Sequence, residues 1–247
     1  MAPPRRSVIR VLIQVALALV VVAALGLALS GLGHRWGWWG VKIGFAILGL
    51  ATLLAALAAA GALAGLGVAL WRQQGAVAGL AAVALVGAGI ELALPLGLVR
   101  AAMRVPRIHD VTTDLARPPA FVAVLARRGP GANPTDRATP DLAALQRRGY
   151  PDLAPAELPL PPDQAMDRAV AAARELGWEI VAAVPAEGRL EATATTAWWA
   201  FKDDVVVRVT PAAGGSRVDL RSVSRVGRSD LGANAARIRA FLAALRR

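Results

Sequence analysis

The first hundred residues contain three long apolar stretches with short polar segments between them. These stretches cover residues 8–30, 41–70 and 76–99. A helix needs about 20 apolar residues to cross the hydrocarbon core of a bilayer. Only a helix or a closed barrel satisfies its backbone polar groups in lipid. The pattern therefore predicts a membrane domain of three transmembrane helices at residues 1–99.

Residues 100–247 have the patterns of a soluble domain. Helical periodicity predicts one helix from Asp163 to Gly177 and another from about Asp230 to Leu245. Alternation of polar and apolar residues predicts four strands between them, at 178–184, 189–196, 203–210 and 217–225. Short connections favour an α+β fold in the order α-β-β-β-β-α, an antiparallel four-stranded sheet with helices on one face. Residues 129–162 hold eight of the sixteen prolines, which predicts an irregular segment.

The third and fourth strands have a register that the turn between them fixes. A turn centred on Ala213 and Gly214 pairs Arg208 with Asp219, Val206 with Arg221, and Asp204 with Val223. One face of the sheet is then apolar, with Val205, Val207, Val209, Val218 and Leu220. The other face carries Glu191, Asp204, Arg208, Asp219 and Arg221. Spacing alone favours a solvated face with cross-strand ion pairs; the alternative is a polar groove covered by the proline-rich segment.

The amino-acid composition excludes several kinds of functional site and partner. The chain has a net charge of +11, but acids are interspersed among the arginines of the soluble part and there is one tyrosine, which disfavours nucleic acid as a partner. There is no cysteine, which excludes disulfides and thiolate sites. His34 and His109 are the only histidines, and no zinc-protease, phosphate-loop or dinucleotide motif occurs. No cofactor and no metal are therefore expected, and catalytic residues stay unknown.

The flanking charges predict the orientation of the membrane helices. Arg5, Arg6 and Arg10 precede the first span and favour a cytoplasmic N-terminus. Three crossings then place the C-terminal domain on the opposite, periplasmic side. A basic cluster after the third span argues the other way; it consists of Arg100, Arg104 and Arg107. Long domains translocate largely regardless of charge, so the first span decides.

Four blocks of the soluble part resemble domain-of-unknown-function family 1499. They are IHDVTTD from Ile108 with PPAF from Pro118, GYPD from Gly149, FKDDVVVRV from Phe201, and DLRSVSRVGRSDLGAN from Asp219. The resemblance covers residues 106–245 and leaves the three spans outside. It implies a bacterial or plastid protein behind a membrane or export signal, with no established activity. We therefore expect a multi-pass protein of the bacterial inner membrane with a periplasmic C-terminal domain, residues 100–247.

The functional prediction is a non-enzymatic binding or interaction module. Its expected partners are the lipid bilayer and an envelope ligand or a membrane protein. The candidate ligand-binding residues are the polar sheet face and the segment after His109. They are His109, Asp110, Asp114, Glu191, Asp204, Arg208, Asp219 and Arg221.

Two alternatives stay open. One is a hydrolase-like enzyme that uses His109 as a base with a carboxylate of Asp110, Asp114, Asp203 or Asp204. This enzyme would need His109 within hydrogen-bond reach of that carboxylate in a concave pocket. The other is an accessory subunit that acts through its spans, by Glu91, the one acid inside them, or by their glycine faces.

Overall fold

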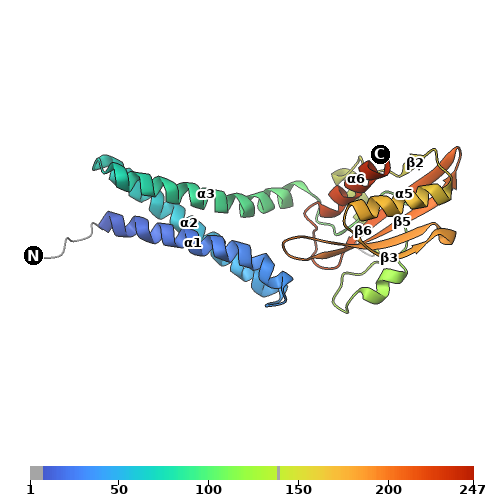
Figure 1. The fold of residues 1–247 in the computed structure, drawn as a ribbon, viewed down its shortest axis with the longest axis horizontal. Coiled ribbons are helices and arrows are strands. Elements are labelled where there is room, and N and C mark those ends of the chain that lie inside the picture. Colours follow the sequence, from blue (N-terminus) through green and yellow to red (C-terminus); the bar gives the residue numbers. More distant parts are fainter. Residues whose placement is uncertain (1–7, 138–139) are drawn as a thin grey trace, which may run out of the picture. The chain divides into compact units, whose positions relative to one another are not determined.

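The chain forms two compact units in a computed structural model that describes residues 8–137 and 140–247 (Figure 1). The first unit runs to Arg100 and also includes Trp198–Ala200. The second consists of Ala101–Ala197 and Phe201–Arg247. Arg5 and Arg6, on which the predicted orientation draws, lie outside the described residues.

Three long helices make up most of the first unit. They are α1 (Val8–Arg35), α2 (Val41–Trp71) and α3 (Gly75–Arg104). By length and composition, each can cross a membrane, which confirms the predicted spans and indicates a multi-pass membrane protein. Each helix extends past the predicted span, by one residue in α2 and by five residues at the C-terminal ends of α1 and α3.

Small residues let α1 and α2 pack closely. Gly65 of α2 lies against Ile13 of α1, and a Cβ atom on Gly65 would come within 2.8 Å of the Ile13 side chain. Ala55, Ala58 and Ala62 continue the same buried stripe of α2. Such small residues are typical of helix interfaces in membranes. The third helix packs over part of its length only, since its buried positions end at Ala88.

The second unit is built on an antiparallel sheet of six strands in place of the predicted four. The order is β1-β6-β5-β4-β3, and β2 also pairs with β6. The strands are β1 (Asp110–Thr112), β2 (Ala156–Leu158), β3 (Glu179–Val184), β4 (Arg189–Thr195), β5 (Lys202–Ala212) and β6 (Gly215–Ser224). Both additional strands pair with β6, one after the other along its length. Each has only three residues, which is too short for an alternation to show in the sequence.

The β5–β6 hairpin has the predicted register. Arg208 pairs with Asp219, Val206 with Arg221, and Asp204 with Val223. The turn uses Gly214 at φ +83° and Gly215 at φ +154°. A side chain at Gly215 would collide with the backbone of β2, since a Cβ atom would lie 2.0 Å from the Leu158 carbonyl oxygen.

Helices α5 (Pro162–Glu175) and α6 (Ala233–Leu245) cover one face of the sheet, as predicted (Figure 1). The core between them includes Met166, Leu190, Leu220, Ile238 and Phe241. The segment 129–162 is less irregular than predicted, because it contains α4 (Leu142–Gly149) as well as β2. Leu142 adds to the core, and the buried Gln146 side chain hydrogen-bonds both backbone polar groups of Thr112 in β1.

Candidate functional site

The second face of the sheet is buried beneath residues 113–137, which we call the covering segment. It includes the 3-10 helix η1 (Ala123–Arg127). Glu191 and Asp204 are 0% exposed, and Asp219 and Arg221 are also buried. The favoured prediction of a solvated face is therefore wrong. The alternation gives the correct face for each residue, but it carries no signal for what covers that face.

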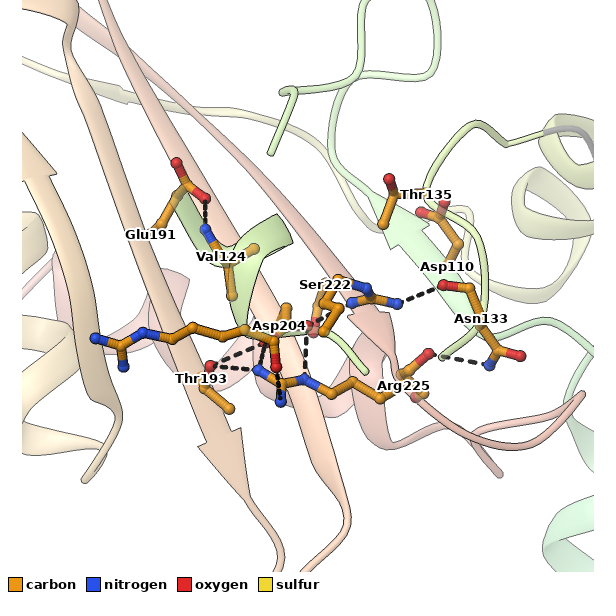
Figure 2. A network of polar contacts seen from close by, with 12 residues as sticks. Asp110, Val124, Asn133, Thr135, Glu191, Thr193, Asp204, Ser222 and Arg225 are labelled. Atoms are coloured by element: carbon orange, nitrogen blue, oxygen red, sulfur yellow. Dashed lines mark hydrogen bonds and ion pairs between the residues drawn. The ribbon is translucent and has the colours of Figure 1, made fainter. Parts of the chain in front are cut away.

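Asp204 lies at the centre of the largest group of contacts (Figure 2). Arg225 donates to both of its carboxylate oxygens, at 2.9 and 2.8 Å, and Thr193 donates at 2.8 Å. Arg128 of the covering segment forms an ion pair with the same carboxylate. Arg128 also donates to the Asn133 carbonyl oxygen at 2.6 Å. Asp204 thus joins β5 to β4, to the residue that follows β6, and to the covering segment.

Asp110 forms a second group of contacts with two arginines. Arg221 approaches it with two nitrogens, at 3.1 and 2.7 Å, and Arg137 donates to it at 2.6 Å. Arg221 also donates to the Thr135 carbonyl oxygen at 2.6 Å and lies 5.2 Å from the centre of the Phe121 ring. A planar guanidinium with several donors suits such a convergent position.

Glu191 binds the start of η1. Its carboxylate accepts hydrogen bonds from the backbone N–H groups of Val122, Ala123 and Val124, at 3.1, 2.9 and 2.9 Å. Figure 2 shows the contact with Val124. Arg189 forms an ion pair with it from the same strand. Burial by itself raises the pKa of Glu191, but these donors outweigh burial, and the pKa lies below its ordinary value. The charged carboxylate satisfies the N–H groups that open a helix.

Asp114 and Asp219 share the remaining two arginines of the face. Arg208 donates to Asp114 at 3.0 Å and to Asp219 at 2.9 Å. Arg217 contacts both carboxylates as well. Asp114 accepts two backbone N–H groups, from Ala116 at 3.0 Å and Arg117 at 2.9 Å. Burial raises the pKa of Asp114, the N–H donors and arginines lower it, and the net direction is downward.

Seven of the eight candidate residues therefore meet on one face, and each is paired with another part of the chain. Several of their partners are not among the eight candidates, although alternation also places Arg189 on this face; these partners are Arg128, Arg137, Arg189, Arg217 and Arg225. Arg225 could have been found, since it alternates with Arg221 and Val223 along the last strand pattern. Arg128 and Arg137 could not, because they lie in a segment without periodicity. Ligand binding by these residues stays a prediction.

His109, the eighth candidate, is held through its backbone. Its carbonyl oxygen accepts hydrogen bonds from the Ser224 N–H at 2.9 Å and from the Asn234 side chain at 3.0 Å. Within residues 8–137 and 140–247, no side chain hydrogen-bonds the His109 ring. The carboxylates that the enzyme hypothesis would pair with it, Asp110 and Asp204 among them, bind arginines instead.

A second polar cluster lies under α6, on the opposite face. Arg237 donates to Asp203 at 2.5 Å and to the Asn234 side-chain oxygen at 2.6 Å, and Ser222 donates to that oxygen at 2.6 Å. Asp203 and its neighbour Asp204 thus point to opposite faces, as the alternation predicts. Asp230 accepts the N–H groups of Gly232 and Asn234, both at 2.9 Å. This cluster joins α6 to β5 and β6.

Tyr150 carries a buried hydroxyl in the apolar core. In the described part of the chain, its oxygen has no hydrogen-bond partner. Burial, with a smaller contribution from Asp230, raises the pKa of Tyr150 to about 12, although the nearby Arg239 acts against this.

A shallow cleft of about 300 Å³ opens where the covering segment meets β4 and β5. Its wall combines proline and aliphatic side chains with two arginines and one acid; the lining residues are Pro118, Pro119, Ala120, Val122, Glu187, Arg189, Val206 and Arg208. In the described residues, no three potential ligands among His, Asp and Glu gather to hold a metal ion.

Comparison with known proteins places the second unit in a family. The family described as protein of unknown function (DUF1499) matches residues 110–245, which is more than half of the chain. No curated protein and no solved structure matches the chain. The matched region contains the whole sheet, the covering segment, and α4 to α6. The chain therefore belongs to the DUF1499 family, with three candidate membrane helices before the shared domain.

Proposed function

We propose that this protein is a membrane-anchored, non-enzymatic interaction module. In this proposal the helices hold it in the bacterial inner membrane, and its C-terminal domain meets an envelope ligand or protein partner on the periplasmic side. The single observation that carries the proposal is that the polar sheet face binds the covering segment of the same chain. Four buried carboxylates, those of Asp110, Asp114, Glu191 and Asp204, link the covering segment to the sheet. In the residues described, none of them pairs with the His109 ring.

The outward side of the covering segment supports an interaction role. Val122 is 56% exposed and Leu125 is 44% exposed, and both lie on or beside η1. The inner side of the segment thus combines charged contacts with the buried Phe121 and Val124, while two large apolar side chains remain on its outer side. Exposed apolar side chains on an ordered backbone suit a binding surface, because little conformational entropy of the segment is lost when a partner binds. The cleft beside Val122 adds a concave surface to this patch.

Site-specific photo-crosslinking in the full-length, membrane-inserted chain tests the interaction role. A photoreactive amino acid replaces Val122 or Leu125, and a matched control replaces Arg168, an exposed residue of α5 on the opposite face. We expect adducts of the same mass from both test positions and none from the control. Equal adducts from Arg168, or none from Val122 and Leu125, would refute an interaction role for this surface.

Two fusions after Arg247 test the orientation. Alkaline phosphatase folds only outside the cytoplasm, whereas a standard fluorescent protein becomes fluorescent inside it. We expect an active phosphatase fusion and a dark fluorescent one, because the first span governs the orientation. The reverse result would place the domain in the cytoplasm and direct the basic cluster after α3 toward anionic lipid.

A further inference from the structure

Helix α3 contains an unpaired carboxyl oxygen and, at the same residue, a backbone carbonyl that loses its usual intrahelical donor. The first is the Glu91 carboxyl, whose Oε2 atom is buried and has no hydrogen-bond partner among the described residues. The second is the backbone carbonyl of the same residue. Pro95 lies inside the helix four residues later and has no N–H to donate to that carbonyl. The Glu91 carboxyl and the Glu91 carbonyl lie on the face of the helix that Glu91 shares with Pro95, four residues later.

These groups lie well inside the hydrocarbon. Glu91 is nine residues before Arg100, which is about 14 Å along a helix. No other charged residue occurs between Arg72 and Arg100. Unsatisfied polar groups at this depth are strongly unfavourable, and an intramembrane carboxyl is therefore a candidate for a specific contact.

The other two helices do not supply the missing partner. The hydroxyls of Ser30 and Thr52 donate to carbonyl oxygens of their own helices, at 2.7 Å each. Gln14 is the seventh residue of α1, whereas Glu91 is the seventeenth of α3, and the two helices cross in the same direction. The two side chains therefore lie about 15 Å apart in depth.

The face that carries Glu91 is packed only in part. The buried positions of α3 stop at Ala88, one turn before Glu91. Glu91, Pro95 and Leu98 continue this face at helical spacing and are only half-buried. From Glu91 onward this face of the helix is therefore only partly covered by the rest of the chain.

We propose that this face is a self-association site, in which α3 of a second copy of the chain packs against Glu91 and Pro95. In hydrocarbon a carboxyl group without a cation is neutral and carries one O–H donor. The Glu91 O–H of each copy donates to the Glu91 carbonyl of the other. A two-fold axis along the membrane normal makes this exchange reciprocal, and it satisfies both groups in both copies with no third component. This inference is independent of the proposed function of the domain.

Disulfide crosslinking tests the contact directly, because the natural chain has no cysteine. Leu98→Cys places a thiol on the proposed face, and Leu96→Cys places one at nearly the same depth on the opposite side, where Leu96 is 49% exposed. After oxidation of the full-length chain in membranes, we expect a dimer from Leu98→Cys and only monomer from Leu96→Cys. No dimer from Leu98→Cys, equal yields, or a product with a foreign protein would overturn the proposal.

Variants of Glu91 test the hydrogen bonds. In the Leu98→Cys chain, Glu91→Leu removes the donor, whereas Glu91→Gln keeps a neutral donor. We expect Glu91→Leu to raise the dimer dissociation constant about tenfold in reconstituted vesicles, and Glu91→Gln to restore most of the affinity. Ile90→Ala, a change at a lipid-facing residue, is the control and should have no effect. An unchanged dissociation constant for Glu91→Leu would overturn the proposed basis of association.

Discussion

Helices α5 and α6 close one face of the six-stranded sheet mainly with apolar side chains, whereas residues 113–137 close the other with ion pairs around a small apolar cluster. On the first face, Phe241 stacks on Trp178 with ring centres 5.3 Å apart. On the second, Asp204 and Asp110 bind arginines from strands and from the covering segment. Both faces are formed by the same strands. Because successive side chains point to opposite faces, the alternation in the sequence assigns most apolar residues to the helix face and most charged residues to the covered face.

The two faces should differ in which substitutions lower the stability of the fold. Apolar burial scales with area and has no charge to neutralise. A buried ion pair is balanced against desolvation, so the loss of one partner leaves an uncompensated charge in the other. The helix face should therefore respond to lost volume, and the covered face to lost charge. Each prediction below tests that distinction.

The largest effect is expected from Phe241→Ala on the helix face. Phe241 is completely buried, and its removal should lower the free energy of unfolding by about 3–5 kcal/mol. Denaturant titration of the full-length chain in detergent measures this. Leu125→Ala on the exposed side of η1 is the control and should stay within about 0.5 kcal/mol. A loss below about 1 kcal/mol for Phe241→Ala would show that this face does not form the core.

The next effect is expected from Asp204→Ala on the covered face. It leaves Arg225 and Arg128 without their shared carboxylate, which should lower the free energy of unfolding by about 3 kcal/mol. The matched control is Asp152→Ala, which removes an exposed pair with Arg239 and should have an effect below about 1 kcal/mol. Equal losses for the two substitutions would mean that burial adds nothing to the Asp204 contacts.

A smaller decrease in the free energy of unfolding is expected when the pH is lowered. Glu191 and Asp114 have pKa values below their ordinary ones in the folded chain. Their contribution to stability is therefore complete above the unfolded-state values near pH 4 and is lost as the pH falls through the lower folded-state values. Burial raises the pKa of Asp230, which acts in the opposite direction.

Unfolding measured from pH 7 to pH 3 should show this loss of stability. The free energy of unfolding should fall less steeply with decreasing pH in Glu191→Gln than in the natural chain. An identical slope in the two chains would contradict the assignment of this pH dependence to Glu191.

The smallest effect, a spectroscopic one, is expected from Tyr150 on the helix face. It is the only tyrosine, so the ultraviolet change on ionisation reports this hydroxyl alone. We expect it to titrate at about 12 in the folded chain and near 10 after unfolding. Since the folded-state pKa is raised, the associated stability is present below pH 10 and is lost as the pH rises through 12. Titration near 10 in the folded chain would show that water reaches the hydroxyl.

Much of the fold follows from periodicity. The three spans, the helices α5 and α6, four strands and the β5–β6 register are all predicted, because each element repeats its pattern over several residues. Strands β1 and β2 are missed, since three residues cannot establish an alternation. The turn glycines fix the hairpin register, which is why the pairing of Arg208 with Asp219 could be predicted.

The candidate site is predictable in its members but not in its environment. Alternation places Glu191, Asp204 and Arg221 on one face, because side-chain direction is a local property of a strand. Their burial depends on the covering segment, which contacts Glu191 from 67 positions away and Arg221 from 102 positions away. No local pattern encodes such contacts, so the face was predicted to be solvated.

The most direct test of the central claim, that buried carboxylates hold the covering segment in place, is hydrogen exchange at the start of η1. The amides of Val122, Ala123 and Val124 donate to Glu191. We predict that they are protected in the full-length chain at pH 7. They should lose most of this protection in Glu191→Gln, while the amides of α5 stay unchanged. Exchange of these three amides at the rate of an open chain in the natural protein would contradict the account.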